Sequence, residues 1–417
     1  MTAASYTETL SAFDRVKAAR VSAPAPTEKL RVAVFSGNYN YVMDGPVRAL
    51  NKLVGHLLAR GHEALVFAPT TDAPAFAHEG ELVSIPSLAL PGSRSEYRLG
   101  LGLRGEALRR LEAFRPTLIH IAAPDITGFM ALKYAEKNAL TPVASFHTRF
   151  DTYPRYYGAR WLEKHVTNYM RNFYGRCEHV YAPSQSMADE LARDGIGKDI
   201  RLWTRGVDRT LFNPGRRDMA WRRAQGFADD DVVVAFVGRV VLEKGIDVFA
   251  DAVLASKTRN PKVRALVVGE GPERARFTEK LPEGVFTGYQ QGEDLARAYA
   301  SADIFFNPSI TETFGNVTLE AMACGLPSVC ASASGSLSLV EDGTTGLLSP
   351  PEKGAAGFSE KLDILAGSPD LRRAYGKAAE EKARDFDWAA ILDSLIGNYR
   401  EAAKARRARG SGGAETQ

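Results

Sequence analysis

The sequence has few cysteines, and their spacing fits neither a metal site nor a disulfide framework. Three occur in 417 residues, at Cys177, Cys324 and Cys330, and no two form a C-x-x-C pair. We therefore expect no zinc site and a reducing compartment, the cytoplasm. Small buried apolar side chains are the role that we expect for all three.

Long apolar runs and strong net charge are also missing. No segment approaches the roughly 20 apolar residues that a transmembrane helix needs, and the first residues lack the apolar core of a signal peptide. The formal net charge is only +3, which gives no reason to expect nucleic acid as a partner. With 45% hydrophobic and 25% charged residues, the composition is that of a globular protein.

Short apolar segments alternate with helical patterns along the whole chain. In the first half they lie at 31–36, 63–69, 117–123, 142–148, 179–184 and 201–207. A second series follows at 232–239, 264–271, 285–290, 303–309, 326–332 and 345–350. Strands that alternate with helices predict parallel sheets covered by helices on both faces.

The pattern predicts the α/β class, with two Rossmann-like parallel-sheet domains that face each other across a cleft. We expect a polar extension over 1–29, a first, acceptor-side domain over 30–207 and a second, nucleotide-binding domain over 208–385. A helix over 386–404 would cross back to the first domain, and 405–417 would be a disordered tail. Open α/β sheets bind ligands at the carboxyl ends of their strands, so the site should lie between the domains.

The most informative motif is DIFFNPSITETFGNVTLEAMACGLPSV at 303–329. A strand is followed by a loop with Glu312 and by a helix that carries Glu320 in its second turn. The amides of Phe314, Gly315 and Asn316 would lie at the helix N-terminus, where unpaired N–H groups favour a diphosphate. Carboxylates accept hydrogen bonds from sugar hydroxyls, so Glu312 would hold a hexose and Glu320 a ribose. The alternative is two solvated charges.

A second motif, GRVVLEKGID at 238–247, places Arg239 and Lys244 after the first strand of the second domain. Two cations there would stabilise the negative charge that develops on a leaving diphosphate. The alternative is a surface loop in which Glu243 pairs with Lys244. In the first domain, Gly45 opens a helix whose amides would contact the same phosphates.

The segment SFHTRFDTYPRYYG at 145–158 places polar groups among aromatic rings, a combination that suits sugar recognition. His147 would lie near the reaction, and Asp151, Tyr153 and Arg155 on the acceptor side. The alternative is a structural histidine. Tyr289 would lie near the nucleotide base.

No metal ion or other cofactor is expected, because cations and a helix N-terminus can take the place of a divalent metal. Two D-x-D-like spots occur, at Asp229 to Asp231 and at Asp385 to Asp387. The first precedes a strand and the second precedes a helix, so turn and cap roles explain both.

GRVVLEKGID together with ETFGNVTLE at 312–320 resembles glycosyltransferase family 4, the retaining nucleotide-sugar transferases of GT-B fold, and the likeness spans about 31–399. The resemblance implies metal-independent transfer of a hexosyl unit from a UDP- or GDP-linked sugar, with retention. It implies that Arg239 and Lys244 bind the donor diphosphate, which Gly45 faces from the first domain. It implies that Glu320 binds the ribose and that Glu312 holds the donor sugar, with amides supplied by Phe314, Gly315 and Asn316. His147 would be the histidine near the reacting sugar carbon.

The 145–158 segment also looks like members that glycosylate membrane lipids, the sulfoquinovosyl- and mannosyl-diacylglycerol synthases. Arginines among apolar residues at 94–116 and 161–176 would suit peripheral binding to an anionic membrane. A membrane glycolipid or lipid-linked glycan would then be the acceptor. An ordinary solvated face is the alternative.

Other functions remain open from the sequence. A nucleotide-sugar epimerase or a sugar phosphorylase would use the same scaffold, and a binding protein would keep the cations without a working acceptor side. A NAD-dependent dehydrogenase would need G-x-G-x-x-G after the opening strand, where the chain reads SGNYNYVMDG. The base, the hexose, the acceptor and the oligomeric state have no residue signature.

Overall fold

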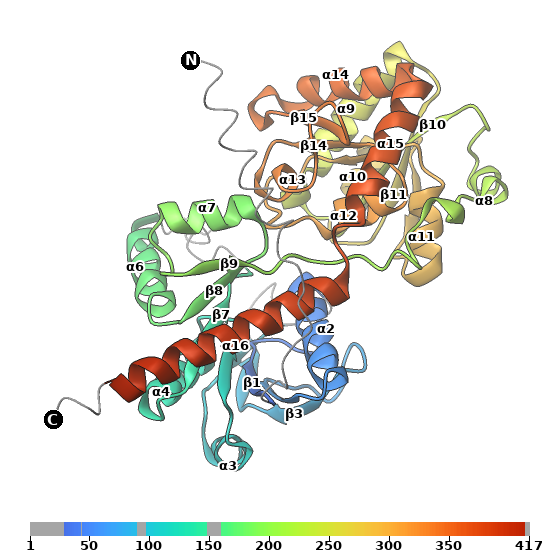
Figure 1. Ribbon diagram of the computed structural model, residues 1–417. Coiled ribbons are helices and arrows are strands. Elements are labelled where there is room, and N and C mark those ends of the chain that lie inside the picture. Colours follow the sequence, from blue (N-terminus) through green and yellow to red (C-terminus); the bar gives the residue numbers. More distant parts are fainter. Residues whose placement is uncertain (1–28, 43, 90–96, 148–159, 413–417) are drawn as a thin grey trace, which may run out of the picture.

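The computed structural model describes residues 29–42, 44–89, 97–147 and 160–412. Its first half forms a seven-stranded parallel sheet of order β3-β2-β1-β6-β7-β8-β9 (Figure 1). The strands are β1 (Arg31–Phe35), β2 (Glu63–Ala68), β3 (Glu81–Ser84), β6 (Leu118–Ile121), β7 (Thr141–Ser145), β8 (His179–Ala182) and β9 (Ile200–Leu202). The central strands are buried along most of their length, as parallel strands covered on both faces must be.

Helices cover both faces of this sheet. One face packs against helices α3 (Gly105–Phe114), α4 (Ile126–Lys137), α6 (Glu163–Tyr174) and α7 (Gln185–Arg193). The other packs against α2 (Gly45–Ala59) and the last helix, α16 (Trp388–Gly412). Strands β4 (Ser87–Ala89) and β5 (Arg98–Gly100) form a separate antiparallel pair. The sequence pattern predicted no strand or helix between residues 70 and 116, so β3, β4, β5 and α3 were not expected.

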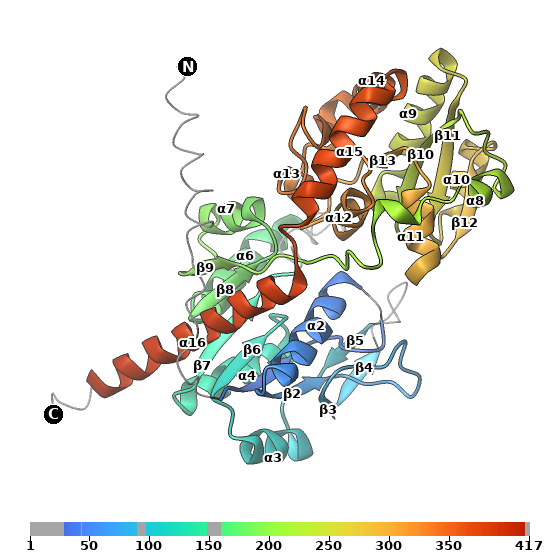
Figure 2. The same ribbon diagram turned by 45° about the vertical axis from the view of Figure 1, so that its right-hand side comes forward.

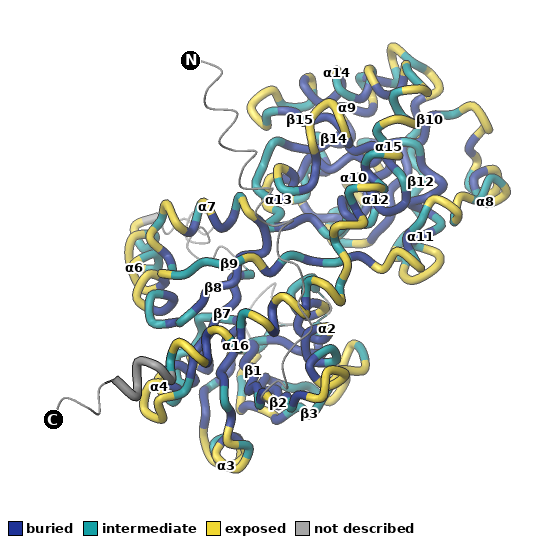
Figure 3. The backbone as a smooth tube through the Cα atoms, viewed as in Figure 1, coloured by how far each residue is buried: buried dark blue, intermediate teal, exposed yellow. Residues whose placement is uncertain are grey.

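The second half repeats the design with a six-stranded parallel sheet of order β12-β11-β10-β13-β14-β15. Its strands are β10 (Val232–Val237), β11 (Val263–Val268), β12 (Val285–Gly288), β13 (Ile304–Asn307), β14 (Ser328–Ala331) and β15 (Gly346–Ser349). Helices α9 (Ile246–Arg259), α10 (Arg274–Lys280) and α14 (Gly354–Gly367) cover one face. Helices α11 (Gly292–Ala300), α12 (Asn316–Ala323) and α15 (Pro369–Ala383) cover the other. Figure 3 shows the two sheets as the buried centres of the two halves.

The last helix belongs spatially to the first half of the chain. Helix α16 leaves the second half after α15 and lies across the first sheet, beside α2 and β7 (Figure 2). Its apolar side chains join the core between them: Leu392, Leu395, Ile396, Tyr399 and Ala402. The helix continues to Gly412, so the expectation of a disordered tail from residue 405 is wrong as far as residue 412.

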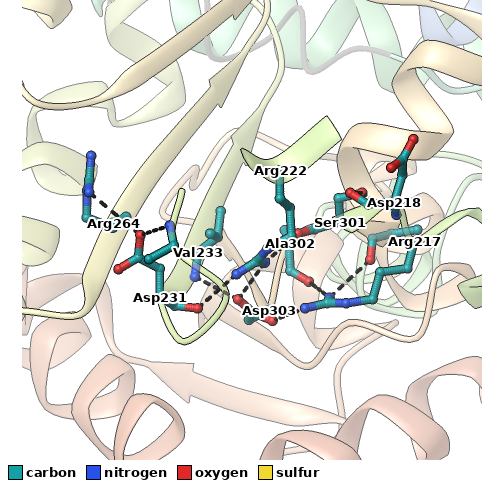
Figure 4. A network of polar contacts seen from close by, with 11 residues as sticks. Arg217, Asp218, Arg222, Asp231, Val233, Arg264, Ser301, Ala302 and Asp303 are labelled. Carbon is teal, nitrogen blue, oxygen red and sulfur yellow. Dashed lines mark hydrogen bonds and ion pairs between the residues drawn. The ribbon is translucent and has the colours of Figure 1, made fainter. Parts of the chain in front are cut away.

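The segment that leads from the first half of the chain into the second, which includes helix α8, is bound to the second half. Helix α8 (Met219–Ala224) carries Arg222, which is only 1% exposed. Its guanidinium donates to the Asp303 carboxylate at 2.9 Å and to the Ser301 carbonyl at 2.7 Å, and Arg217 binds the same carboxylate at 2.7 Å (Figure 4). A buried arginine paired in this way cannot move independently of the sheet. Bending between the halves is therefore left to the segments before residue 213 and around residue 386.

Those two segments lie against each other. The Val207 amide donates to the Phe386 carbonyl at 3.0 Å. Gly206 has no room for a side chain, because an added Cβ would lie 2.6 Å from the Trp388 ring. The two crossings between the halves thus form one compact hinge.

Candidate active site

Glu312 and Lys244, from two different loops, form an ion pair at the carboxyl edge of the second sheet. The Lys244 Nζ lies 2.6 Å from Glu312 Oε1, and both side chains are mostly buried. The Glu312 carbonyl accepts from the Gly335 amide at 3.0 Å, which fixes the loop after β13. The surface-loop alternative, in which Glu243 pairs with Lys244, does not hold. A cation and an acceptor of hydroxyl hydrogen bonds are therefore held side by side.

Helix α12 begins directly after this loop, with its N-terminus uncapped by any side chain. Gly315 is the N-cap at φ 95°, a left-handed conformation that glycine adopts without strain. Phe314 turns into the core and meets Phe386 of the hinge edge-on, with ring centroids 5.9 Å apart. The phenylalanine thus anchors the turn, and the helix N-terminus presents its partial positive charge beside Lys244.

Glu320, on the second turn of α12, lies in a largely buried position. Its Oε2 accepts a hydrogen bond from the fully buried Tyr299 hydroxyl at 3.0 Å. Burial raises the pKa of Glu320 to about 7, while the Tyr299 hydrogen bond and the positive charge of Arg48 oppose this rise. Burying a carboxylate costs free energy. Glu320 is therefore not the solvated surface charge that was the alternative interpretation.

Two glycine-rich turns form the wall beside Arg239. Gly238 ends β10 at φ 151° and Gly269 ends β11 at φ 139°. A Cβ on Gly269 would lie only 1.9 Å from the Gly238 carbonyl oxygen, so the two backbones touch. Arg239 is exposed at this edge. Tyr289, which follows β12, is 60% exposed and so remains available to a ligand.

The N-terminus of α2 in the first half faces the N-terminus of α12 in the second. A Cβ on Gly45 would lie 2.9 Å from Asn316 Nδ2, so the two helix starts are in near contact. Asp44 caps α2 by accepting from the Val47 amide at 2.9 Å. Burial raises the pKa of Asp44, and the positive charge of Arg239 is among the opposing effects. Two helix N-termini and two cations thus converge on one place between the domains.

His147 lies just after β7 with both ring nitrogens bonded to protein groups. Its Nδ1 lies 2.8 Å from Arg205 Nη2, and its Nε2 lies 2.8 Å from Ser145 Oγ. Burial, the Arg205 charge and His120 lower the pKa of His147 well below its usual value, so the ring is neutral. Asp151, Tyr153 and Arg155 lie outside the described residues. Arg205 follows β9 in the segment TRGVD, and the sequence-based prediction did not include it. Its positive charge was the only feature that could have indicated a role.

Three aspartates of the two D-x-D-like spots have structural partners. The Asp231 carboxylate accepts from the Ala228 amide at 2.8 Å, and Asp229 pairs with Arg223. Asp387 accepts from the Ala390 amide at 2.9 Å in the first turn of α16. Asp231 and Asp387 thus have the turn and cap roles that the sequence predicts, and Asp229 is held in an ion pair. Within the residues that the structure describes, no group of three or more potential metal ligands occurs.

Two family models match the chain. The model described as Glycosyltransferase Family 4 matches residues 43–211, and the model described as Glycosyl transferases group 1 matches residues 231–367. The two matches fall on the two parallel-sheet halves. No helix in the described ranges is long and apolar enough to cross a membrane.

Curated relatives match over nearly the whole chain. A GDP-mannose-dependent alpha-mannosyltransferase of Mycobacterium tuberculosis is 33% identical over 91% of this chain and 98% of its own length. Sulfoquinovosyl transferase SQD2 of Arabidopsis thaliana is 30% identical over 88% of this chain and 72% of its own length. Among solved structures, sucrose-phosphate synthase from Thermosynechococcus elongatus superposes with a TM-score of 0.70 at 21% identity. That superposition covers 90% of this chain and 99% of the other, and it shows the shared GT-B fold.

Proposed function

Because the chain belongs to glycosyltransferase family 4 and is a hexosyltransferase that uses nucleotide sugars, we propose that it transfers mannose or a related hexose from a GDP- or UDP-linked donor, with retention, to a glycolipid at a membrane surface. The observation that carries the proposal is the convergence of Lys244, Arg239 and the N-termini of α2 and α12 on one place. Two side-chain cations and the uncapped N-terminus of α12 lie there, and all three attract the negative charge of a nucleoside diphosphate.

Each donor group has a partner of suitable chemistry. Arg239, Lys244 and the α12 amides bind the diphosphate, Glu312 accepts from hexose hydroxyls and Glu320 from the ribose. During transfer the bond between the sugar C1 and the phosphate oxygen breaks, and its electron pair stays with the diphosphate. The acceptor oxygen bonds to C1 on the same face and releases its proton to a phosphate oxygen. Transfer then needs no metal ion, and we expect it to persist in excess EDTA.

The first test is a thermal-shift and transfer panel of GDP-, UDP- and ADP-sugars. GDP-mannose is the first donor to examine, because the relative at 33% identity is named for it. The cognate donor should raise the melting temperature by mass action. Lys244→Met should abolish that shift and lower kcat/KM by about 100-fold or more. Glu243→Gln, an exposed neighbour in the same loop, is the matched control. Equal behaviour of the two variants, or no shift with any donor, would contradict the proposed site.

A lipid acceptor is supported by apolar side chains on the first domain. Trp161 is 74% exposed, and Tyr169 on α6 and Ile126 at the start of α4 are 40% and 46% exposed. The Tyr169 hydroxyl donates to the Pro124 carbonyl at 2.8 Å, so α6 lies beside the start of α4. Lys164 and His165 are exposed on the same helix. Aromatic groups next to basic ones suit an anionic membrane surface.

Vesicle binding tests this part separately. The protein should sediment with vesicles that contain 30% phosphatidylglycerol and not with pure phosphatidylcholine vesicles. The double variant Trp161→Ser and Lys164→Gln should reduce sedimentation and transfer to glycolipid, while the donor thermal shift stays unchanged. Efficient transfer to a water-soluble glycan with no vesicle binding would overturn the lipid acceptor and leave the donor assignment intact.

A further inference from the structure

A continuous chain of hydrogen bonds runs through the first domain from the hinge to the last helix. Arg205, only 4% exposed, donates to His147 Nδ1 at 2.8 Å, and His147 Nε2 meets Ser145 Oγ at 2.8 Å. The same oxygen lies 3.0 Å from His120 Nε2, and His120 Nδ1 lies 2.6 Å from the Tyr399 hydroxyl. We call these five residues the histidine relay. None of them is among the donor contacts proposed above.

One end of the relay determines where the His147 proton lies. A guanidinium has only donors, so the nitrogen that faces Arg205, Nδ1, must be an acceptor. In the neutral ring the proton is then on Nε2, and it is donated to the Ser145 hydroxyl. A serine oxygen accepts this bond whether its own proton goes to His120 or elsewhere. The tautomer of His147 therefore follows from Arg205 alone.

This arrangement leaves neither ring nitrogen of His147 free to take a proton from an acceptor. Arg205 itself is held firmly, since it donates to the Trp203 carbonyl at 2.7 Å and lies over the Trp203 ring. The next residue, Gly206, packs against Trp388 at the start of α16, and Tyr399 lies further along that helix. Both ends of the relay are thus attached to the two chain segments that join the domains.

We infer that Arg205 is a positioning residue for the transfer reaction: it holds His147 as a neutral imidazole with its proton on Nε2, so that the ring is fixed at the end of β7 and does not act as the proton acceptor. The inference rests on the proposed function for its kinetic consequence. The tautomer itself does not depend on that function, and so the two can fail separately.

The first experiment reads the tautomer directly. Long-range 1H–15N spectra of the full chain labelled in its histidines distinguish the two nitrogens, and His147→Gln assigns the resonance. We expect the Nε2–H form of His147 and no titration between pH 5.5 and 8. A proton on Nδ1, or titration in that range, would overturn the inference even if the enzyme is active.

The second experiment compares two replacements of Arg205. Arg205→Gln keeps an N–H donor for Nδ1, whereas Arg205→Met keeps only the approximate length of the side chain. Arg205→Met should lower kcat by about 10- to 100-fold with little change in the donor KM. It should also let the Nδ1–H form of His147 appear in the long-range 1H–15N spectra, while burial still keeps the ring neutral. Arg205→Gln should restore most of kcat and the Nε2–H form.

Arg201→Gln is the control for general damage to this region. Arg201 binds Asp199, Asn398 and Glu401, and so links β9 to α16 without contacting the relay. Its kcat should match that of the original protein. Equal loss of kcat in the Met and Gln variants of Arg205, with equal loss of thermal stability, would show that Arg205 is only structural. Loss of the donor thermal shift in all variants would instead count against the proposed donor site.

Discussion

Glu320 is a residue at which binding and stability oppose each other. Its pKa of about 7 lies above the ordinary value because burial disfavours the carboxylate. The unliganded fold therefore loses stability as the pH rises from the ordinary carboxyl pKa to about 7, and the loss is complete above that pH. A ligand whose hydroxyls bind the carboxylate would offset this loss.

Glu320→Gln should therefore stabilise the unliganded protein at pH 8 by on the order of 2 kcal/mol, with almost no effect at pH 4.5. Urea unfolding at the two pH values measures this difference. The same variant should bind the nucleoside diphosphate about 10-fold more weakly, since a charge-assisted acceptor for the ribose is lost. Glu360→Gln, on the exposed side of α14, is the control that should change neither quantity. Destabilisation of the Gln variant at pH 8 would refute the argument.

At the scale of the element, most of the parallel strands and their order along the chain were readable from the sequence, but β3, β4, β5 and α3 were not. Apolar runs such as 232–237 identified buried strands because parallel sheets exclude polar side chains from both faces. Strand β3 lies at the sheet edge with only Val83 buried, and β4 and β5 are three residues long, so none gave a strong signal. The second-domain motifs placed Glu312 and Glu320 correctly on a loop and a helix.

The partners of those residues could not be read in the same way. Lys244 and Glu312 are 68 positions apart, and only the packing of two loops brings them together. Arg205 reaches His147 across 58 positions. Such pairings depend on the register of two strands and on the path of the loops after them. Neither is encoded in a local pattern of residues.

The connector helix α8 depends on one carboxylate. Asp303 accepts from Arg217, Arg222 and the Val233 amide. Asp303→Asn leaves the buried Arg222 without a counter-charge, and we expect a loss of about 3–5 kcal/mol in the free energy of unfolding. The matched control is Asp294→Asn, which removes only an exposed pair with Arg297 and should cost less than about 1 kcal/mol. Similar losses in both variants, measured by denaturant unfolding, would contradict the role of the network in Figure 4.

For the molecule as a whole, buried histidines predict sensitivity to acid. Burial lowers the pKa of His120 to about 3, and the pKa values of His147, His62 and His179 are also lowered. The unfolded chain then binds more protons below the ordinary histidine pKa. Above pH 6.5 the buried histidines cost no stability, and below it each fully buried histidine lowers the free energy of unfolding by up to about 1.4 kcal/mol per pH unit. Glu320 acts in the opposite sense, so Glu320→Gln should steepen the fall.

Urea unfolding between pH 7.5 and 5 measures this dependence, and calorimetry in buffers of different ionisation enthalpy counts the protons taken up. We expect net proton uptake on unfolding throughout this range. Proton release, or stability that increases on acidification, would show that the histidine effect does not exceed the opposite effect of buried carboxyl groups such as Glu320.

The path of α16 also has a consequence for biosynthesis. The first sheet is made before the second, but one of its two covering layers includes Leu392, Leu395 and Ile396, which are made after the second sheet. Until then an apolar surface beside α2 stays open, at a time when the second sheet can already form. The first domain can therefore complete its core only after the second sheet has been made, although its own sheet is made first.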